Sequence, residues 1–295
     1  MTALLIKGAE VAAKIREELK KEIAELAERH DVVPGLATVL VGADPASLVY
    51  VGGKERTSKE LGIYSERYDL PAATTRKDLI TLVKRLNKDP RISGILVQLP
   101  LPRHLSEEEV LYAIDPAKDV DGFHPVNLGK LMIGEPDYVP CTPAGIQQLL
   151  LHYEIRTDGA EVVVVGRSNI VGKPIANILM QKAPGANATV TICHTRTRDI
   201  AFHTRRADIL IVAAGMPRSI TSDMVKEGVV VIDVGENEVG RTREGKRILV
   251  GDVDFETVKE KARAITPVPG GVGPMTITML MVNTVRAAKL AAGIA

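Results

Sequence analysis

The sequence predicts a two-domain α/β protein in which a parallel sheet, covered by helices on both faces, forms much of the second half. Strand and helix patterns alternate along the 295 residues, and this length corresponds to about two domains of roughly 150 residues each. The strands of the second half are apolar at almost every position, as in VVVVG at 162–166. Such strands are typical of parallel sheets that are buried on both sides.

In the first half, a long helix is predicted near the N-terminus because apolar residues recur there at spacings of four and three. These residues are Val11, Ile15, Leu19, Ile23 and Leu26. A second helix is expected at 106–114, where Ser106 caps an acidic first turn. The other expected elements are a strand at 36–42, helices at 46–62 and 76–88, and a strand at 92–102 that ends in prolines. Residues 118–131 have no clear period and are expected to form an irregular loop, a kind of segment that often carries function.

From about residue 140 strands and helices alternate more regularly. The expected elements are a helix at 141–153, a strand at 161–166, a helix at 172–182, strands at 188–194, 208–215 and 229–235, a Pro/Gly-rich connection at 265–276 and a final helix at 276–292.

Composition excludes several classes of protein. The net charge of +1 provides no general field that would attract nucleic acid or an acidic membrane, and 3% aromatics without Trp argue against stacking of single-stranded nucleic acid. No apolar run approaches the ~18 residues of a membrane span. Cys141 and Cys193 lack metal-site spacing. We therefore expect two reduced thiols, no metal site, no nucleic-acid or membrane partner and a cytoplasmic location.

The segment VVVVGRSNIVGKP at 162–174 has the form of a strand that enters a glycine turn and then a helix. A helix start near Gly172 would offer free N–H groups and a positive dipole end to a pyrophosphate, with Gly166 opening the turn. Ser168 stands where the second glycine of the usual dinucleotide motif would be, and the last spacing is one residue longer. An ordinary strand–helix turn is the alternative interpretation.

The next strand bears on the choice of cofactor. NAD-binding folds usually place Asp or Glu ~20 residues further on, to hold the ribose hydroxyl. Here the strand is followed by Thr195 and Arg196, and no carboxylate comes before Asp199. Together with Arg167, these residues favour NADP, because a guanidinium suits the additional phosphate. The alternative is that the arginines are solvated loop charges. Gly215, at the end of strand 208–215, is a further candidate for cofactor binding.

Tyr50 and Lys54 are four residues apart, so a helix would place a phenol and an ammonium on one face. A lysine that performs acid–base work needs a pKa lowered toward neutrality, although such a pair is also common on solvated helices. Gln98 ends a buried strand, at the edge where α/β folds bind ligands. Asp121 can accept two hydrogen bonds from a heterocycle, whereas Asp119 fits better as a loop cap.

With these residues in view, the chain resembles the bifunctional methylenetetrahydrofolate dehydrogenase/methenyltetrahydrofolate cyclohydrolase (FolD) family. The resemblance covers nearly the whole chain, and its segments are SLVYVGGK, GILVQLPLP, KDVDGFHPVNLGKL, PCTPAGI, VVVVGRSNIVGKP, ADILIVAAG and TPVPGGVGPMT. It implies oxidation of 5,10-methylenetetrahydrofolate with NADP+ and hydrolysis of the methenyl product to 10-formyltetrahydrofolate, in one-carbon metabolism and purine biosynthesis.

The resemblance also implies roles for residues. Lys54 is expected to be the acid–base residue, Gln98 to tune its pKa, Tyr50 to stack on the folate and Asp121 to anchor the pterin. Ser47 and Pro100 would shape the pocket. Arg167 and Ser168 would bind cofactor phosphates. Gly270, Gly271 and Pro274 would line the cleft wall where nicotinamide meets folate.

At the level of domains, the resemblance implies a catalytic, folate-binding domain of residues 1–139 with 268–295, closed by the C-terminal helix. Residues 140–267 would form a Rossmann-type NADP-binding domain. Homodimers that pair through the Rossmann domains are expected.

Two features of the sequence depart from the family pattern. Gly52 and Gly53 stand between Tyr50 and Lys54, where relatives have bulkier or polar residues, and each glycine costs a helix about 1 kcal/mol relative to alanine. This predicts a locally loosened helix. Thr195 stands where many relatives have Ser, which leaves the strength of the NADP preference open.

Three rival interpretations remain. A short-chain dehydrogenase also uses a Tyr–Lys pair, but there the glycine turn comes first, whereas Tyr50 precedes it here. A monofunctional dehydrogenase would not need Lys54 and Gln98. A nucleotide-sensing or scaffolding protein would not need the polar residues of both half-sites.

Overall fold

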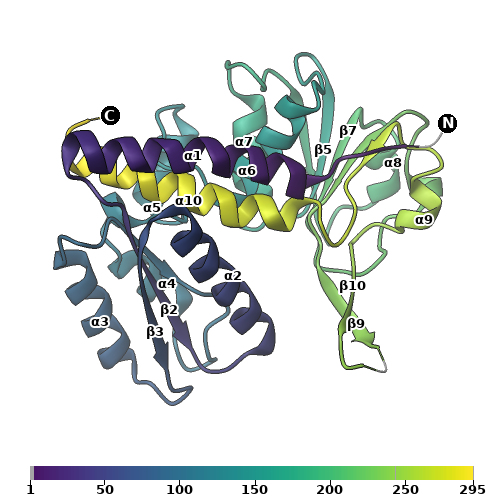
Figure 1. Ribbon diagram of the computed structural model, residues 1–295. Helices are drawn as coiled ribbons and strands as arrows, with labels where there is room; N and C mark the ends of the chain where they lie inside the picture. The colour runs from purple at the N-terminus through teal and green to yellow at the C-terminus, as the bar shows by residue number, and fades with distance from the viewer. Residues whose placement is uncertain (1–2, 243, 295) are drawn as a thin grey trace. The chain divides into compact units, whose positions relative to one another are not determined.

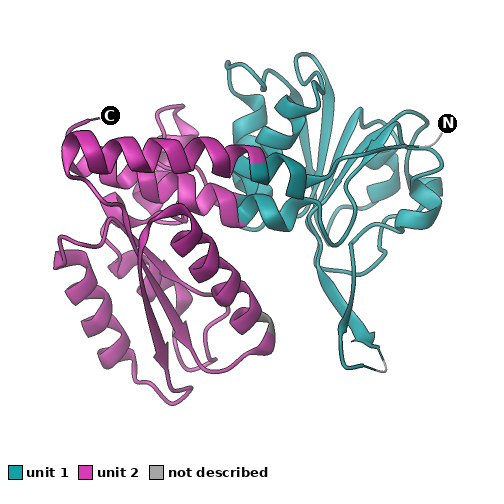
Figure 2. Ribbon diagram, in the orientation of Figure 1, with its two compact units in different colours: residues 1–13, 142–276 teal, residues 14–141, 277–295 magenta. Residues whose placement is uncertain are grey.

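The computed structural model describes residues 3–242 and 244–294, which divide into two compact units. Unit 1 consists of residues 1–13 and 142–276, and unit 2 of residues 14–141 and 277–295 (Figure 2). The helices α1 (Gly8–His30) and α10 (Val272–Ala291) contribute residues to both units.

Unit 1 is built on a six-stranded sheet in the order β1-β11-β8-β7-β5-β6, with all neighbouring strands parallel (Figure 1). Its strands are β1 (Leu4–Leu5), β5 (Glu161–Val165), β6 (Thr189–Cys193), β7 (Ile209–Val212), β8 (Val230–Asp233) and β11 (Ala264–Ile265). All residues of β7 and β8 are buried. The apolar runs of the sequence therefore predicted the parallel sheet correctly, because these strands are covered on both faces.

The remaining elements of unit 1 include two short helices and a hairpin that the sequence did not predict. The helices are α6 (Cys141–His152), α7 (Gly172–Met180), α8 (Ile200–Thr204) and α9 (Phe255–Val258), with a 3-10 turn at Ser222–Met224. The hairpin pairs β9 (Asn237–Arg241) with β10 (Arg247–Val250). Most of its residues are polar or exposed, so no buried face was visible in the sequence.

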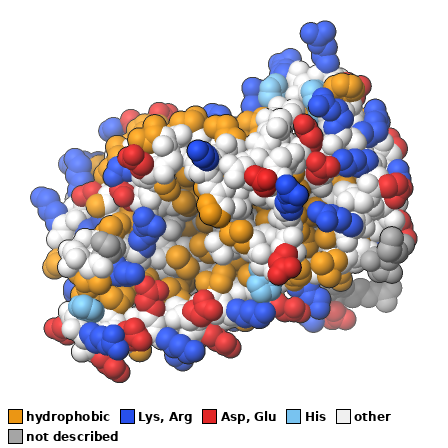
Figure 3. All heavy atoms as spheres, turned by 90° about the horizontal axis from the view of Figure 1, so that it is seen from above, with side chains coloured by type: hydrophobic (Ala, Val, Ile, Leu, Met, Phe, Trp, Pro, Cys, Tyr) orange, Lys and Arg blue, Asp and Glu red, His pale blue; other side chains and the backbone are white. Residues whose placement is uncertain are grey.

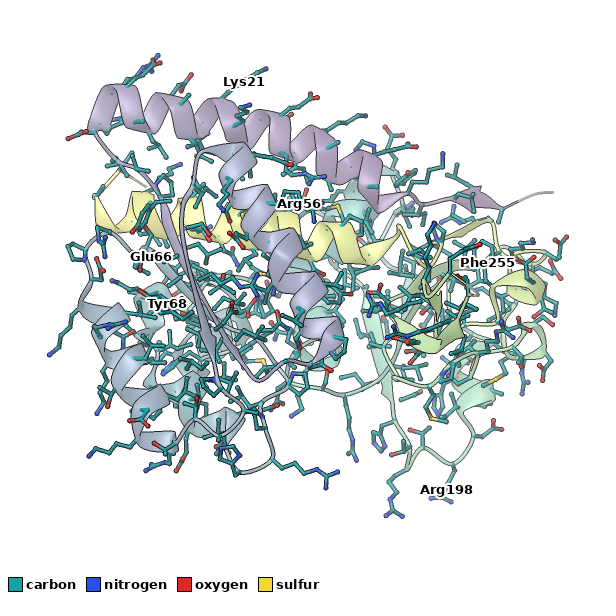
Figure 4. All side chains as sticks on the ribbon, turned by 60° about the horizontal axis from the view of Figure 1, so that its bottom comes forward. Lys21, Arg56, Glu66, Tyr68, Arg198 and Phe255 are labelled. Atoms are coloured by element: carbon teal, nitrogen blue, oxygen red, sulfur yellow. The ribbon has the colours of Figure 1, made fainter. Side chains whose placement is uncertain are left out.

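Unit 2 contains a three-stranded parallel sheet in the order β3-β2-β4. Its strands are β2 (Gly35–Val41), β3 (Tyr64–Leu70) and β4 (Gly94–Val97), and its other helices are α2 (Pro45–Leu61), α3 (Arg76–Lys88), α4 (Glu107–Ala113) and α5 (Pro125–Met132), with a 3-10 turn at Pro116–Lys118. The edge strand β3 was not predicted, because its residues are mostly polar and half-buried. Glu66 on this strand accepts hydrogen bonds from the hydroxyls of Tyr64 and Tyr68. Glu66 and Tyr68 are labelled in Figure 4.

Several predicted helices are confirmed in detail. Along α1, Val11, Leu19, Ile23 and Leu26 are buried and form the expected stripe. The hydroxyl of Ser106 accepts a hydrogen bond from the N–H of Glu109 at 3.2 Å, which is the predicted cap of α4.

The predicted loop at 118–131 is partly wrong, because its second half is the helix α5. Pro125 occupies the first turn of this helix, and the ring of His124 accepts the N–H of Val126 at 3.2 Å. A helix of eight residues with an internal Gly129 is too short to show a period. Other boundaries also differ: for example, β4 ends at Val97, and α10 begins at Val272, inside the expected Pro/Gly-rich connection.

The compact units and the expected functional domains divide the chain differently. Residues 1–13 and 268–276 belong to unit 1, together with residues 142–267. The assignment of residues 1–139 with 268–295 to folate and 140–267 to NADP remains a prediction about function.

The described surface carries both charges. On the face shown in Figure 3, Lys and Arg side chains are interspersed with Asp and Glu, in keeping with the net charge of +1. None of the helices in the described part of the chain has the length and apolar character to cross a membrane.

Candidate active site

Helix α2 carries three of the candidate residues of unit 2. The carboxylate of Asp44 accepts the N–H of Ser47 at 2.8 Å, and Pro45 begins the helix. Ser47 is buried in this first turn, and Tyr50 and Lys54 follow on one face at successive turns. The helix continues without a break through Gly52 and Gly53 and ends at Gly62, whose φ is 83°.

Lys54 is buried, with 7% of its surface exposed, and its ammonium donates to Gln98 Oε1 at 3.0 Å. Gln98 directly follows β4, and its backbone N–H donates to Val39 O at 2.9 Å. Its amide nitrogen donates to Leu99 O at 2.7 Å, which turns the amide oxygen toward Lys54. The peptide bond between Leu99 and Pro100 is cis.

Burial lowers the pKa of Lys54, although the negative charge of Asp121 opposes that shift. Burial raises the pKa of Asp121 to about 6, against the attraction of Lys54. At neutral pH, Asp121 is thus mostly ionised, and Lys54 is closer to neutrality than a lysine in water. A buried lysine with a nearby carboxylate has the properties of an acid–base residue.

The two aspartates of the 118–131 segment have different roles. Asp119 is buried, and one of its oxygens accepts the N–H of His124 at 2.7 Å and the amide of Asn127 at 2.8 Å. It is the loop cap that the sequence predicted. The capped backbone holds Asp121 in place two residues later, beside the thiol of Cys141.

Two residues at this site were missed by the sequence analysis. The thiol of Cys141 lies 3.5 Å from Val120 O and 3.6 Å from an oxygen of Asp121. Burial and the charge of Asp121 raise the pKa of this thiol well above its usual value, so it stays protonated and donates. The amide of Asn283 donates to Val120 O at 2.8 Å and to Val139 O at 2.9 Å. The motif PCTPAGI pointed to Cys141, whereas no sequence signal marked Asn283.

In unit 1, two glycines permit a close approach of backbone segments after β5. A Cβ on Gly166, whose φ is 132°, would lie 2.3 Å from Ala213 O. A Cβ on Gly172 would lie 2.3 Å from Gly166 O. Only glycine fits at both positions, and the result is the tight strand–turn–helix cradle that dinucleotide sites require.

Ser168 closes the start of α7. Its hydroxyl oxygen accepts the N–H groups of Val171 at 3.0 Å and Gly172 at 3.3 Å, and its carbonyl accepts that of Lys173 at 3.0 Å. The expected free N–H groups at this helix start are therefore partly occupied, because Ser168 acts as their cap. The positive end of the helix dipole remains, and the hydroxyl hydrogen of Ser168 can still be donated.

A second turn lies beside this cradle. Gly166 N donates to Cys193 O at 2.9 Å, which ties the end of β5 to the end of β6. After β6, the ring of His194 accepts the N–H of Arg196 at 3.1 Å. The resulting turn exposes Thr195 and Arg196 at the same sheet edge as the exposed Arg167.

The other candidates of unit 1 surround the start of α10 and the end of β7. Gly270 O accepts the N–H of Ala9 at 3.3 Å, and a Cβ on Gly271 would lie 2.6 Å from Pro267 O. Pro274 is in the first turn of α10. Gly215, with a φ of 65°, follows β7.

The structure thus groups the candidate residues within the two units. Unit 2 holds Ser47, Tyr50, Lys54, Gln98, Pro100 and Asp121, and unit 1 holds Gly166, Arg167, Ser168, Gly172, Thr195, Arg196, Gly215, Gly270, Gly271 and Pro274. In the described residues, no group of three or more His, Cys, Asp or Glu side chains could hold a metal ion. A cavity of about 480 Å³ in unit 1 is lined by other residues, among them Arg218, Asp233 and Phe255.

Comparison with known proteins identifies the family. Residues 6–121 match the model of the tetrahydrofolate dehydrogenase/cyclohydrolase catalytic domain, and residues 140–292 match that of its NAD(P)-binding domain. The chain belongs to the tetrahydrofolate dehydrogenase/cyclohydrolase family. The predicted family, the two-domain α/β fold and the NADP cofactor are confirmed, and the bifunctional interpretation is favoured over the monofunctional one.

Relatives of this family resemble the whole chain. Bifunctional protein FolD of Syntrophus aciditrophicus is 67% identical, with both chains covered completely. A bifunctional FolD structure from Campylobacter jejuni is 48% identical, has a TM-score of 0.91 and covers 98% of this chain and 99% of its own. The FolD structure from Trypanosoma brucei, complexed with NADP cofactor and inhibitor, is 39% identical, has a TM-score of 0.94 and covers 99% of both chains.

Proposed function

We propose that this chain oxidises 5,10-methylenetetrahydrofolate with NADP+ and then hydrolyses the methenyl product to 10-formyltetrahydrofolate, with the named residues in the roles given below. The observation that carries the assignment of residues is the hydrogen bond from buried Lys54 to Gln98 beside Asp121. The chemistry of both steps is compatible with these groups.

In the first step, a hydride leaves the methylene carbon of the folate. The lone pair of the adjacent ring nitrogen stabilises the resulting cation, so this step depends on positioning rather than on a protein base. Tyr50 orients the folate through its ring face. Asp121, ionised at neutral pH because its pKa is about 6, accepts hydrogen bonds from the pterin.

In the second step, water adds to the methenyl carbon. Lys54, whose pKa is lowered by burial, takes a proton from the water and returns one to the nitrogen that leaves as the ring opens. Gln98 holds the lysine nitrogen in place through the 3.0 Å hydrogen bond. Ser47 and Pro100 shape the pocket around the substrate.

The cradle at Gly166 and Gly172 fits a dinucleotide, because a Cβ at either position would collide with the backbone. When bound, NADP+ supplies the hydride acceptor. Arg167, Ser168, Thr195 and Arg196 would hold its phosphates, and Gly215 would line its path. Gly270, Gly271 and Pro274 would contact the folate substrate where the nicotinamide meets it. The two exposed arginines favour the additional phosphate of NADP, since a guanidinium binds phosphate through two parallel hydrogen bonds.

We also propose that the protein acts in the cytoplasm, supplies one-carbon units for purine biosynthesis, and forms a homodimer through its Rossmann-type domain. The edge strand β6 supports the last proposal, because it is the last strand in the order of the sheet and carries an exposed Ile192. Light scattering on the purified protein and on an Ile192→Lys variant tests it. A monomeric parent protein would contradict the proposal.

The decisive experiment mixes the protein with 5,10-methylenetetrahydrofolate and NADP+ and follows NADPH and the methenyl compound together. NADPH formation with little methenyl and with 10-formyl product supports both activities. Accumulation of methenyl in step with NADPH would contradict the roles of Lys54 and Gln98.

A further inference from the structure

Two buried carboxylates lie next to the loop that follows β7 in unit 1. Asp233, at the end of β8, and Asp252, two residues after β10, are both almost completely buried. Neither belongs to the candidate active site described above. A buried carboxylate carries a large desolvation cost unless it is well hydrogen-bonded, so the groups that these carboxylates bind indicate what they do.

Asp252 binds the loop itself. One of its oxygens accepts the backbone N–H of Ala214 at 2.7 Å and that of Gly215 at 2.9 Å. Its other oxygen accepts the side-chain amide of Asn237 at 2.9 Å. The carboxylate therefore joins the turn after β7 to the start of the β9–β10 hairpin.

Asp233 fixes Asp252 in turn. One oxygen of Asp233 accepts the N–H groups of Gly235 and Asp252, each at 3.0 Å, and the other accepts that of Val253 at 3.0 Å. The backbone N–H of Asp233 donates to the hydroxyl of Thr266 at 2.8 Å. The ends of three neighbouring strands, β7, β8 and β11, are thus connected by one network of hydrogen bonds.

The network is closely packed, because two glycines leave room for the carboxylates. A Cβ on Gly251 would lie 1.8 Å from an oxygen of Asp233, and one on Gly235 would lie 2.3 Å from the carboxyl carbon of Asp252. The two carboxylates therefore fill the space beside Gly235 and Gly251, and neither position has room for a residue larger than glycine.

This network also bears on the dinucleotide cradle. The position of a Cβ on Gly166 is 2.3 Å from Ala213 O, so the turn after β5 packs directly against the turn after β7. Asp252 holds the next two residues of that second turn, Ala214 and Gly215. Hydrogen bonds from backbone N–H groups to a carboxylate are stronger than those to a neutral acceptor, so Asp252 orients these two N–H groups firmly.

We propose that Asp252, supported by Asp233 and Asn237, is a positioning residue for NADP binding: it fixes the turn at Ala214 and Gly215 that forms the second wall of the dinucleotide cradle. This inference rests on the proposed function, which places the cofactor at that cradle. It makes no claim on Ser47, Tyr50, Lys54, Gln98, Pro100 and Asp121, which belong to unit 2.

The test compares Asp252→Ala and Asp252→Asn with the parent protein. We expect the Kd and KM for NADP+ to rise at least about tenfold in Asp252→Ala, because two N–H groups lose a charged acceptor. Asp252→Asn retains one acceptor oxygen and should give an intermediate value. Hydrolysis of added 5,10-methenyltetrahydrofolate, measured without cofactor, should be unchanged in kcat and KM.

Asp254→Asn is the matched control, since this carboxylate lies two residues further on and binds the hydroxyl of Thr257 instead. It should leave NADP+ binding unchanged. If Asp252→Ala fails to fold, Asn237→Ala replaces it, because it removes the donor to the other oxygen of Asp252 and, besides that, only a 3.4 Å side-chain bond to Val250 O. A smaller rise in the Kd for NADP+ is expected for it.

Unchanged NADP+ binding in all of these variants would overturn the inference. So would a parallel loss of NADP+ binding and of the hydrolysis reaction, because that pattern indicates a general structural role. Failure of the parent protein to bind NADP+ would instead contradict the proposed function.

Discussion

Lys54 is the residue on which the hydrolytic half of the proposed function depends. Lys54 is buried, its Nζ donates a hydrogen bond to Gln98 at 3.0 Å, and its pKa is lowered. In Lys54→Met, we expect the hydrolysis of methenyltetrahydrofolate to fall by 10²-fold or more, the usual contribution of a general acid–base group. NADPH formation should persist, because hydride loss needs no protein base, and assays of both steps on one preparation check this.

Asp121 is expected to lower the stability of the folded protein at neutral pH while it strengthens the binding of the folate substrate. Its pKa is raised to about 6, so the folded state binds a proton more tightly than the unfolded chain does. Its contribution to stability is present at low pH and is lost as the pH rises through about 6. Asp121→Asn should therefore stabilise the protein more at pH 7.5 than at pH 5, with a difference of about 1–2 kcal/mol in the free energy of unfolding.

The same variant should raise the KM for the folate substrate, because an amide oxygen is a weaker acceptor than a carboxylate. Thermal unfolding at the two pH values and folate kinetics measure the two effects. Asp119→Asn is a poor control, since Asp119 caps the loop. Asp137→Asn, at a half-exposed surface pair, is a better one. Equal stabilisation by Asp121→Asn at both pH values would contradict the argument.

At the level of elements, the sequence was most informative where side-chain pattern and burial agree. The apolar strands β7 and β8 and the apolar stripe along α1 indicated correctly which residues are buried. The edge strand β3, the hairpin β9–β10 and the short helix α5 were missed, because each has a face in solvent or too few residues to establish a period.

The candidate site was predictable to a similar extent. Motifs with long, ordered spacing led to Lys54, Gln98 and Asp121. In contrast, Asn283 and Asp252 act through bonds to backbone groups that are far away in sequence. Their partners exist only once the chain is folded, so the spacing of residues carries no information about them.

Helix α2 provides a test of the two glycines next to Lys54. A Cβ on Gly52 would meet nothing within 4 Å, whereas one on Gly53 would lie 3.3 Å from Ile277 Cδ1. Gly52→Ala should therefore stabilise the protein by about 1 kcal/mol, the helix propensity difference. Gly53→Ala should gain less, because Ile277 must move.

If the glycines loosen the helix, Gly52→Ala should also slow amide exchange around Lys54 and change turnover. Hydrogen exchange and kinetics on the same preparations measure this. Unchanged exchange together with unchanged turnover would show that the helix around Lys54 is already rigid.

On the scale of the whole molecule, the two sets of candidate residues lie in separate units of the chain. The acid–base group and its partners come from unit 2, and the dinucleotide cradle comes from unit 1. The two chemical steps should therefore be separable by mutation, although one active protein performs both. Gly166→Ala places a Cβ 2.3 Å from Ala213 O and should abolish NADP+ binding, while hydrolysis of added methenyltetrahydrofolate continues.

A mixture of Gly166→Ala and Lys54→Met then tests the division directly. Lys54→Met should release methenyltetrahydrofolate, which the Gly166→Ala protein should hydrolyse, so that 10-formyl product follows a transient methenyl signal. Gly159→Ala is the control for alanine at a positive φ in unit 1, because its Cβ would meet nothing within 4 Å. The rate of spontaneous hydrolysis, measured with Lys54→Met alone, sets the baseline. If the mixture does not exceed that baseline, the residues of the two units do not act as independent half-sites.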